Sequence, residues 1–345
     1  MNRNFLKIGF FIALGTSIIV SCSKDDDGVD GGQNLESIQL YTSNNNDGNI
    51  TVYDLVSGDV QTLSTTSTMA EGVYYDANSD EIIQASRSSN QLNAYTGIST
   101  LLNGSSLNIS IAASVSSESS LESPRDIAAN DNFVIVSDNA DVDGNDATAD
   151  GRLFIFTRTN GSLILRNTVT TDFALWGIEF VGNDLYAVVD KTNQLAVFAN
   201  FTASNTANTT VSATKKIAIE GIVRTHGLAY DNGTMILTDV GSAMDDTDGA
   251  FHIITAFDAK FSGVSNGGIL AVAGNQTRVS GAATSLGNPV AAEYDADSNT
   301  VFIAEAANGG GKVLAFSNAD AGGNITPSMN NNLSKASSLY FYSNK

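Results

Sequence analysis

The sequence has few of the residues that reveal a chemical function directly. Its 345 residues include one cysteine, one tryptophan, two histidines and three prolines. A single cysteine excludes an internal disulfide, because a disulfide needs two. The sequence also lacks a Gly-x-Ser-x-Gly elbow, a Walker loop and a paired-histidine zinc motif, which leaves the common hydrolytic and phosphoryl-transfer machineries without support. We therefore assign no catalytic residue, and these absences favour a non-enzymatic function without excluding an enzyme.

Charge is also scarce, and positive charge most of all. Only 16% of residues are charged, and 17 Lys and Arg face 37 Asp and Glu, for a net charge of −20. Nucleic acid is excluded as a partner, since a phosphate backbone is bound by clustered basic residues. Asn, Ser, Thr and Gly must therefore carry most of the polar surface. With 42% hydrophobic residues the chain can bury a sizeable core, and its 31 glycines and many Asn-Gly or Asp-Gly turns favour short strands over helices.

The one cysteine, Cys22, follows a segment with the features of a signal peptide. Arg3 and Lys7 precede an apolar run over residues 8–20, which is too short for a transmembrane helix. The sequence Ile-Val-Ser-Cys that ends at Cys22 resembles the bacterial lipobox. That resemblance implies cleavage after residue 21, a diacylglycerol and palmitate on Cys22, and a membrane anchor. An ordinary secretory signal with an incidental cysteine is the alternative.

Three aspartates, Asp25 to Asp27, follow the cysteine closely. This run resembles the acidic export signal of surface lipoproteins in the Bacteroidota, which implies an outer-membrane location facing the exterior. A solvated charge run is the simpler explanation of the same residues. Residues 22–36, rich in Asp, Gly, Asn and Ser, are predicted to form a flexible tether.

The rest of the chain repeats a three-strand unit about every fifty residues. Each unit has a strand after a small or Gly residue, a strand ending in an acid or Ser, and a strand ending in an aromatic residue. The units begin at Gly72, Asp126, Gly177, Gly227 and Ala291. A last first-strand starts at Ser338, close to the end of the chain, and its missing partners lie near Ile38, Asn49 and Val60. We therefore expect one sheet to join both ends of the chain.

A ring closed in this way is a β-propeller, because closure removes the open sheet edges of a linear array. The sequence predicts an all-β fold over residues 37–345, with six blades of four strands each. The strand–acid–loop–strand pattern, as in residues 185–198, resembles that of NHL-type propellers, a superfamily with mixed functions. A seven-bladed ring or a pair of β-sandwiches is the structural alternative.

In such a ring, the residues just before the first strands should meet around one mouth of the central channel. Those residues include Glu71, Arg125, Trp176 and His226. An acid, a guanidinium, an indole and an imidazole together suit a small-molecule or glycan site. Trp176 could stack on a sugar, and His226 could act as a general base. The alternative is structural: Arg125 pairs with Glu71, and Trp176 plugs the channel.

A long acidic loop in the second unit resembles calcium loops. Asn139, Asp141, Asp143 and Asp150 stand at loop positions 1, 3, 5 and 12, with Gly144 at position 6. The spacing is similar to that of EF-hand and integrin-type loops, although Asp replaces the longer Glu at position 12. Calcium binds six to eight oxygens, and a glycine at the turn lets alternating carboxylates point at one centre. Calcium is therefore a possible cofactor, and a solvated acidic loop is the alternative.

Three functions compete on this basis. The leading hypothesis is a surface-tethered binding or scaffold module that recognises a glycan, peptide or partner protein through the mouth residues. The second is a calcium-dependent lactonase or esterase, since gluconolactonase-type propellers hold calcium at the channel mouth. Glu71 matches their glutamate, but Arg125, Trp176 and His226 stand where that resemblance requires metal ligands. The third is a spacer without a small ligand, which an occluded, apolar mouth would support.

Overall fold

The computed structural model describes residues 37–344, without residues 146 and 160. The predicted signal peptide, Cys22 and the tether therefore lie outside the described residues. The regular secondary structure of the described chain is almost entirely β-strand. Its helical elements are the short helices α1 (Ile98–Leu102), α2 (Phe201–Ser204) and α3 (Phe257–Gly263), and the single-turn 3-10 elements η1 (Ala282–Thr284), η2 (Asn308–Gly310) and η3 (Ala319–Ala321). None of the described helices is long and apolar enough to cross a membrane.

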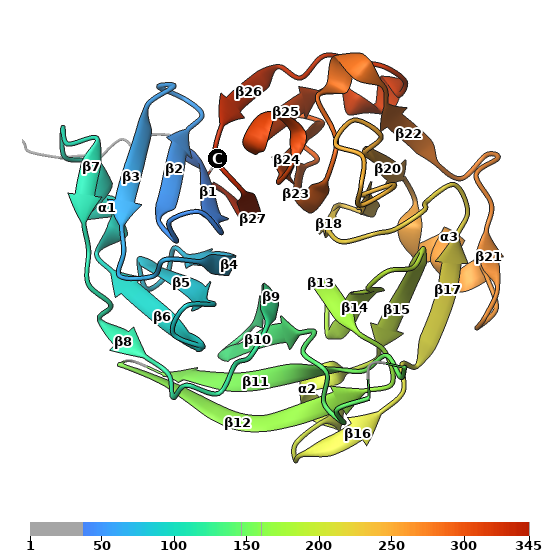
Figure 1. Ribbon diagram of the computed structural model, residues 1–345, viewed down its shortest axis with the longest axis horizontal. Coiled ribbons are helices and arrows are strands. Elements are labelled where there is room, and N and C mark those ends of the chain that lie inside the picture. The colour runs from blue at the N-terminus through green and yellow to red at the C-terminus, as the bar shows by residue number, and fades with distance from the viewer. Residues whose placement is uncertain (1–36, 146, 160, 345) are drawn as a thin grey trace, which may run out of the picture. The chain divides into compact units, whose positions relative to one another are not determined.

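Six sheets stand as blades around a central axis (Figure 1). From the inner strand outward, blade 1 contains β4 (Ala70–Asp76), β5 (Glu81–Ser86), β6 (Gln91–Thr96) and β8 (Val115–Ser116). Blade 2 contains β9 (Pro124–Asn130), β10 (Phe133–Asp138), β11 (Gly151–Thr159), β12 (Ser162–Thr171) and β16 (Thr209–Val211). Blade 3 contains β13 (Leu175–Val181), β14 (Asp184–Val189), β15 (Gln194–Phe198), β17 (Lys215–Ile219) and β21 (Ile269–Leu270).

The other three blades complete the ring. Blade 4 contains β18 (Leu228–Asp231), β19 (Thr234–Asp239), β20 (Ala250–Ile254) and β22 (Thr277–Ser280). Blade 5 contains β23 (Pro289–Asp295), β24 (Thr300–Glu305), β25 (Lys312–Ser317) and β26 (Met329–Asn332). Blade 6 contains β27 (Ala336–Ser343), β1 (Ile38–Asn44), β2 (Ile50–Asp54), β3 (Val60–Ser64) and β7 (Asn108–Ser110). The predicted six-bladed propeller is confirmed.

The ring closes where the sequence places the closure. The C-terminal strand β27 pairs antiparallel with the N-terminal strand β1, with Leu40 opposite Phe341 in the register. This pairing continues into β2 and β3 and makes one sheet from the two ends of the described chain. In the closed ring the inner edge of each sheet faces the central channel, where it is protected from pairing with another chain.

Three blades carry a fifth strand that the sequence does not predict. β7, β16 and β21 each come from the connection between the third and fourth strands of one blade and pair, in parallel, with the outer edge of the preceding blade. A single bridge between Val279 and Gly323 links blade 5 to blade 4 in the same way. We call these four contacts latches. Among the described residues, no latch joins blade 2 to blade 1 or blade 6 to blade 5; in both cases a tight hairpin replaces the long connection.

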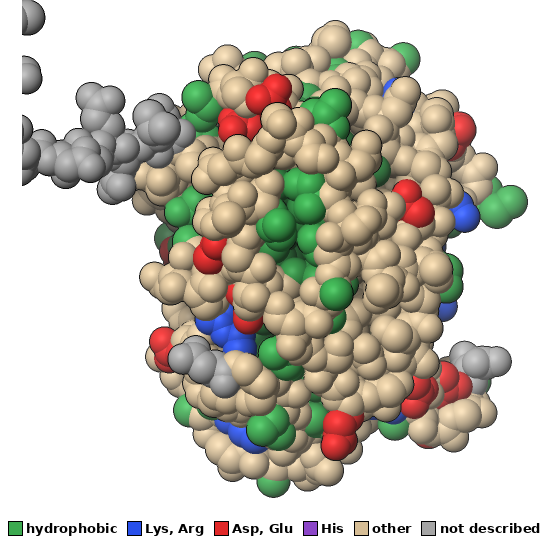
Figure 2. All heavy atoms as spheres, turned by 90° about the vertical axis from the view of Figure 1, so that its left-hand side faces the viewer, with side chains coloured by type: hydrophobic (Ala, Val, Ile, Leu, Met, Phe, Trp, Pro, Cys, Tyr) green, Lys and Arg blue, Asp and Glu red, His purple; other side chains and the backbone are tan. Residues whose placement is uncertain are grey.

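The core lies between the blades. The buried apolar side chains form six clusters, one at each interface between neighbouring blades. Period-two alternation produces this arrangement, because each sheet has two faces and both pack against a neighbour. Large aromatic side chains fill the interfaces, and those of Tyr41, Phe156, Phe251 and Phe316 are fully buried. On the side of the propeller that Figure 2 shows, uncharged polar side chains and backbone dominate the surface, in line with the low charge content.

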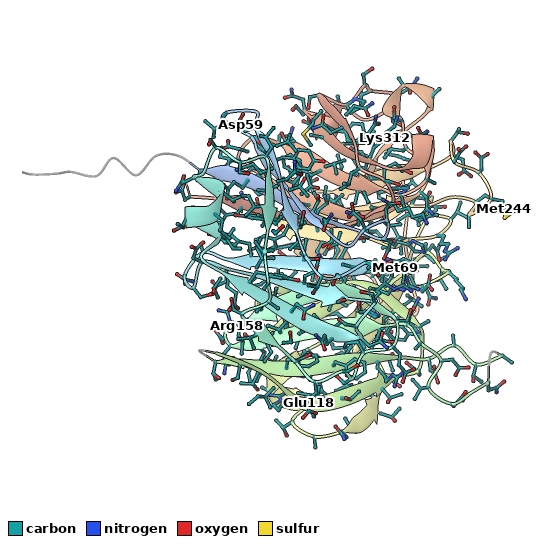
Figure 3. All side chains as sticks on the ribbon, turned by 60° about the vertical axis from the view of Figure 1, so that its left-hand side comes forward. Asp59, Met69, Glu118, Arg158, Met244 and Lys312 are labelled. Carbon is teal, nitrogen blue, oxygen red and sulfur yellow. The ribbon has the colours of Figure 1, made fainter. Side chains whose placement is uncertain are left out.

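The propeller has two faces, which differ in the strand ends they expose. The inner strands begin at the face that carries Met69 and Met244, which we call the mouth face (Figure 3). They end at the opposite face, which carries Asp59 and Arg158. The predicted mouth residues and the acidic loop of blade 2 all belong to the mouth face.

Candidate functional site at the channel mouth

Backbone bulges place the predicted mouth residues. In five inner strands the regular pairing with the second strand is interrupted at the mouth, and the unpaired residues are Glu71 with Gly72, Arg125, Trp176 with Gly177, Val290, and Ser337. A bulge turns a side chain away from the regular alternation of the strand. Gly72 has a φ of 82°, and a Cβ there would lie 2.8 Å from the side chain of Ile127. Glycine at this position therefore lets Glu71 reach its place at the mouth.

Glu71 and Arg125 form an ion pair between blades 1 and 2. Nη1 of Arg125 donates to both carboxylate oxygens of Glu71 at 3.2 Å. Arg87 donates to the same carboxylate, also at 3.2 Å, and the Asn45 amide adds a short hydrogen bond of 2.5 Å. Glu71 is 4% exposed, so its charge is buried and needs these partners. The ion pair that the structural alternative expects is therefore present.

Trp176 lies between two other mouth residues. The imidazole of His226 stacks on the indole with ring centroids 3.8 Å apart and planes 3° from parallel. The guanidinium carbon of Arg125 lies 4.1 Å from the centre of the same indole. Two planar groups that close to one ring centre must lie on opposite faces, because on one face they would clash. Neither face of the indole is left for a sugar ring.

His226 is held by Asp190 of blade 3. Nε2 of His226 lies 3.3 Å from Oδ1 of Asp190, and Arg224 donates to that oxygen at 3.3 Å. Burial lowers the pKa of His226, although Asp190 acts in the opposite direction. Burial alone would raise the pKa of Asp190, but His226 and Arg224 outweigh it and lower that pKa. His226 is 3% exposed, so the geometry assigns it to the stack and does not favour a general base facing a substrate.

The role of Asp190 departs from a pattern shared by other blades. Asp138, Asp239 and Glu305 also end second strands, and each accepts backbone N–H groups from the loop that leads into its own inner strand. Each of the three also accepts the backbone N–H of the residue two positions later, which is the turn-capping role that acids take in tight turns. Asp190 instead contacts side chains of the next blade, Arg224 and His226. The exception therefore lies at the candidate site.

Below the mouth, carboxyl groups line a central cavity of about 490 Å³. Asp126, Glu179 and Glu293 belong to this lining, together with Tyr74 and Tyr340. Burial raises the pKa of Asp126 to about 7 and that of Glu179 to about 8, and the proximity of the two acids adds to the rise in Glu179. Burial, reinforced by Glu179 and Asp126, also raises the pKa of Glu293 well above its usual value. All three residues keep part of their surface, which borders this cavity, so their desolvation is partial and the pKa shifts set an upper limit on its effect.

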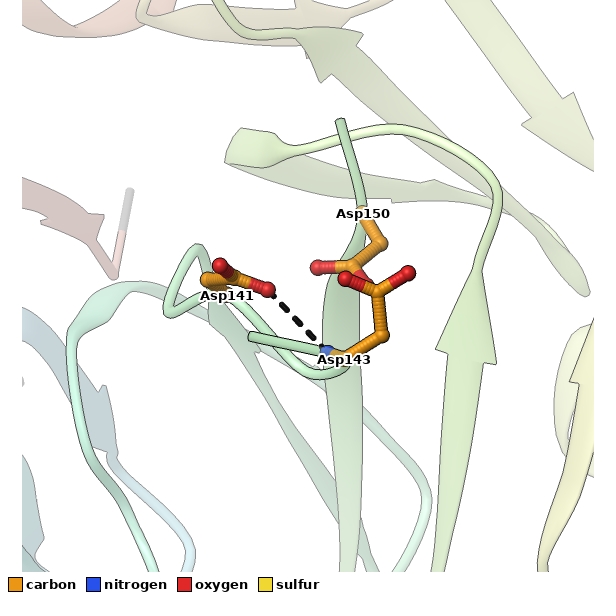
Figure 4. Close-up of side chains that lie close together, drawn as sticks. All are labelled: Asp141, Asp143 and Asp150. Carbon is orange, nitrogen blue, oxygen red and sulfur yellow. Dashed lines mark hydrogen bonds between the residues drawn. The ribbon is translucent and has the colours of Figure 1, made fainter. Parts of the chain in front are cut away.

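The acidic loop of blade 2 brings three of its four predicted ligands together (Figure 4). Carboxylate oxygens of Asp141, Asp143 and Asp150 lie within 4.8 Å of one another, close enough to share one cation. Gly144 has the left-handed φ of 75° that the sharp turn requires. The fourth predicted ligand, Asn139, has other partners for its amide: Oδ1 accepts from Nε of Arg125 at 2.8 Å, and Nδ2 donates to Asp190 at 3.4 Å. Three carboxylates fit a calcium ion but supply only part of its usual six to eight oxygens.

Sequence reasoning missed several residues of the site. Arg87, Arg224 and Asp190 lie in loops or at strand ends, where only the fold shows which groups meet. For Glu179 and Glu293, the position in the repeat unit predicts a place in the channel. Each is the third residue of its repeat unit, and with period two this position faces the channel.

The fold defines the class of this protein as a six-bladed β-propeller, and comparison with known proteins does not narrow it further. No protein-family model and no curated protein matches the sequence. A candidate 6-phosphogluconolactonase from Bacteroides fragilis is 9% identical, with a TM-score of 0.58 over 91% of this chain and 100% of the other. A second candidate 6-phosphogluconolactonase, from Bacteroides uniformis, is 8% identical, with a TM-score of 0.57 over 89% and 99%. A chain of a nidogen–laminin complex is 11% identical, with a TM-score of 0.57 over 88% and 98%. At these identities the likeness shows the fold alone.

Proposed function

We propose that this protein is a lipid-anchored outer-membrane lipoprotein whose propeller faces the exterior and binds a glycan, peptide or partner protein at its mouth face. The lipobox-like sequence ending at Cys22 and the acidic run after it support the location. The observation that carries the binding role is the cluster of Glu71, Arg125, Trp176 and His226. Four neighbouring blades supply its members, and three of them stand at backbone bulges.

The chemistry of the mouth favours binding over the other two functions. A spacer would need no charges at the mouth, whereas here Arg87, Arg125 and Arg224 surround two buried acids. A lactonase would need Glu71 as a metal ligand, but its oxygens already accept from Arg125, Arg87 and Asn45. Arginine beside a carboxylate also repels a cation. The three-acid cluster that could hold a metal among the described residues lies in the blade 2 loop instead.

Capture by the full chain tests the binding role. Immobilised protein is screened against a glycan array and a peptide array, with an Arg125→Ala/Trp176→Ala double variant as comparison. We expect the double variant to lose the ligands that the natural chain captures. Equal capture by both proteins would show that ligand binding does not depend on Arg125 and Trp176 at the mouth. Protease accessibility on intact cells and metabolic labelling with a palmitate analogue, blocked by Cys22→Ser, test the location.

Calcium binding by the blade 2 loop is a separate proposal. Asp141, Asp143 and Asp150 would hold the ion, which would fix the loop that starts beside Arg125 through Asn139. The ion would then have a structural role at the edge of the mouth. No catalytic step follows from it.

A further inference from the structure

Arg125 is fixed in space and keeps one donor group unused. Its Nε donates to Asn139 at 2.8 Å, its Nη1 donates to Glu71 at 3.2 Å, and its guanidinium carbon lies 4.1 Å from the centre of the Trp176 ring. Within the described part of the chain, Nη2 makes no hydrogen bond. The side chain is 14% exposed, so the mouth is not sealed over it. The planar guanidinium matches a carboxylate, and a fixed one loses little entropy on binding.

We propose that the mouth binds a single carboxylate group through Nη2 of Arg125, an inference that rests on the binding function proposed above. Arg87 and Arg224 stand on either side, and both keep about a quarter of their side chain exposed, at 27% and 23%. The three arginines, Arg87, Arg125 and Arg224, pair with only two acids, Glu71 and Asp190. One positive charge is left over at the mouth of a chain whose net charge is −20.

The surroundings limit the ligand to one acidic group. Asp141, Asp143 and Asp150 belong to the same face, and together they keep a negative charge, with or without a bound divalent cation, that disfavours a polyanion at the mouth. A neutral sugar has no indole face to stack on, because Arg125 and His226 cover both faces of Trp176. The remaining chemistry is charge-assisted hydrogen bonding to a compact monoanion. A sugar acid and the free C-terminus of a peptide both present such a carboxylate.

The test uses ligand pairs that differ only in the carboxylate. The full chain is titrated by calorimetry and ligand-observed NMR, at millimolar concentrations, with glucuronate against glucose. A second arm compares an acetylated dipeptide that has a free C-terminus with its amide. We expect at least one acid to bind at least about tenfold more tightly than its neutral counterpart, since a charged hydrogen bond contributes about one factor of ten or more. The arm that binds identifies the source of the carboxylate, and higher salt should weaken the binding.

Two variants give the matched comparison. Arg125→Gln should lower the affinity at least about tenfold, whereas Arg158→Gln should leave it unchanged. Arg158 is also a partly buried arginine paired with acids, Asp76 and Glu81, but it lies on the opposite face (Figure 3). If Arg125→Gln does not fold, the Arg125→Gln/Glu71→Gln double variant replaces it, because that change removes both charges of the pair.

Three results would overturn the inference: equal binding of acid and neutral ligands, no binding of either acid, or equal losses in the Arg125 and Arg158 variants. The array screen separates this failure from failure of the proposed function. Mouth-dependent capture of neutral ligands alone would reject the carboxylate and keep the binding role. Capture that survives the Arg125→Ala/Trp176→Ala change would reject the binding role itself.

Discussion

The carboxyl groups inside the channel make the stability of the propeller depend on pH. Glu179 has a pKa of about 8 in the folded chain, against an ordinary value of 4.5. The folded chain therefore holds a proton that the unfolded chain releases. The contribution of this proton to the free energy of unfolding is fully present below about pH 4.5. It is lost as the pH rises to about 8, because over that range the unfolded state binds fewer protons than the folded state. At about 1.4 kcal/mol per pKa unit, the loss from Glu179 reaches at most about 5 kcal/mol.

A neutral replacement isolates this effect. Glu179→Gln keeps the size of the side chain and mimics its protonated form, so the variant should not suffer this loss. The free energy of unfolding in urea is measured at pH 5 and pH 9 for both proteins. We expect the variant to gain several kcal/mol relative to the natural chain between the two pH values, up to about 4, because part of the loss has already occurred at pH 5. The gain is smaller than the sum of the separate pKa shifts of Asp126, Glu179 and Glu293 would give. Asp126 raises the pKa of Glu179, and both raise the pKa of Glu293, so the shifts do not add.

The comparison with an exposed acid decides the interpretation. Glu118→Gln makes the same chemical change on an exposed loop, outside the channel lining. It should shift the stability equally at both pH values. If Glu179→Gln shows the same pH dependence as the natural chain, the channel carboxyls do not control it and the argument from desolvation is wrong.

Three further outcomes follow from the geometry. Asp239→Ala should lower the free energy of unfolding in urea by about 3 kcal/mol, because three backbone N–H groups that donate to this fully buried carboxylate at 3.0 to 3.1 Å lose their acceptor. Asp239→Asn should lower it less, since the side-chain carbonyl of asparagine still accepts. Gly72→Ala should lower stability by about 1–3 kcal/mol through its positive φ and its clash with Ile127, while Gly58→Ala, with a similar φ and open space, should cost less. Calcium at a hundredfold excess over its Kd should raise the melting temperature by the equivalent of about 2.7 kcal/mol, and Asp143→Asn should abolish the rise; an unchanged melting temperature in the natural chain would show that the loop does not bind calcium.

The repeat pattern was sufficient to predict the ring. Alternating apolar residues mark the inner three strands of each blade, and turn residues separate them, so blade number and closure follow. The fifth strands leave no such pattern. β7, β16 and β21 contain only two or three residues and lie at the outer edge, so they bury too little to need an apolar repeat. Their pairing depends on the neighbouring blade, which a single sequence does not show.

The mouth was predicted in position but not in arrangement. Glu71, Arg125, Trp176 and His226 do meet, because each precedes an inner strand and the strands converge. The sequence did not reveal that Trp176 is covered on both faces, since stacking depends on side-chain directions set by the bulges. Nor did the sequence reveal that the amide of Asn139, the first predicted calcium ligand, accepts a hydrogen bond from the charged Nε of Arg125.

The latches make the six joints of the ring unequal. Where β7, β16 and β21 cross from one blade to the next, backbone hydrogen bonds hold the joint, and these are little affected by dissolved ions. The joint between blades 1 and 2 has no latch among the described residues, and ion pairs cross it instead: Glu71 with Arg125 at the mouth, and Asp76 and Glu81 with Arg158 at the opposite face. Ionic strength should therefore act on this joint more than on the latched ones. This joint and the joint between blades 5 and 6 are the two without a latch among the described residues, so we expect them to open before the others. Opening the joint between blades 1 and 2 would separate Glu71 from Arg125 at the mouth.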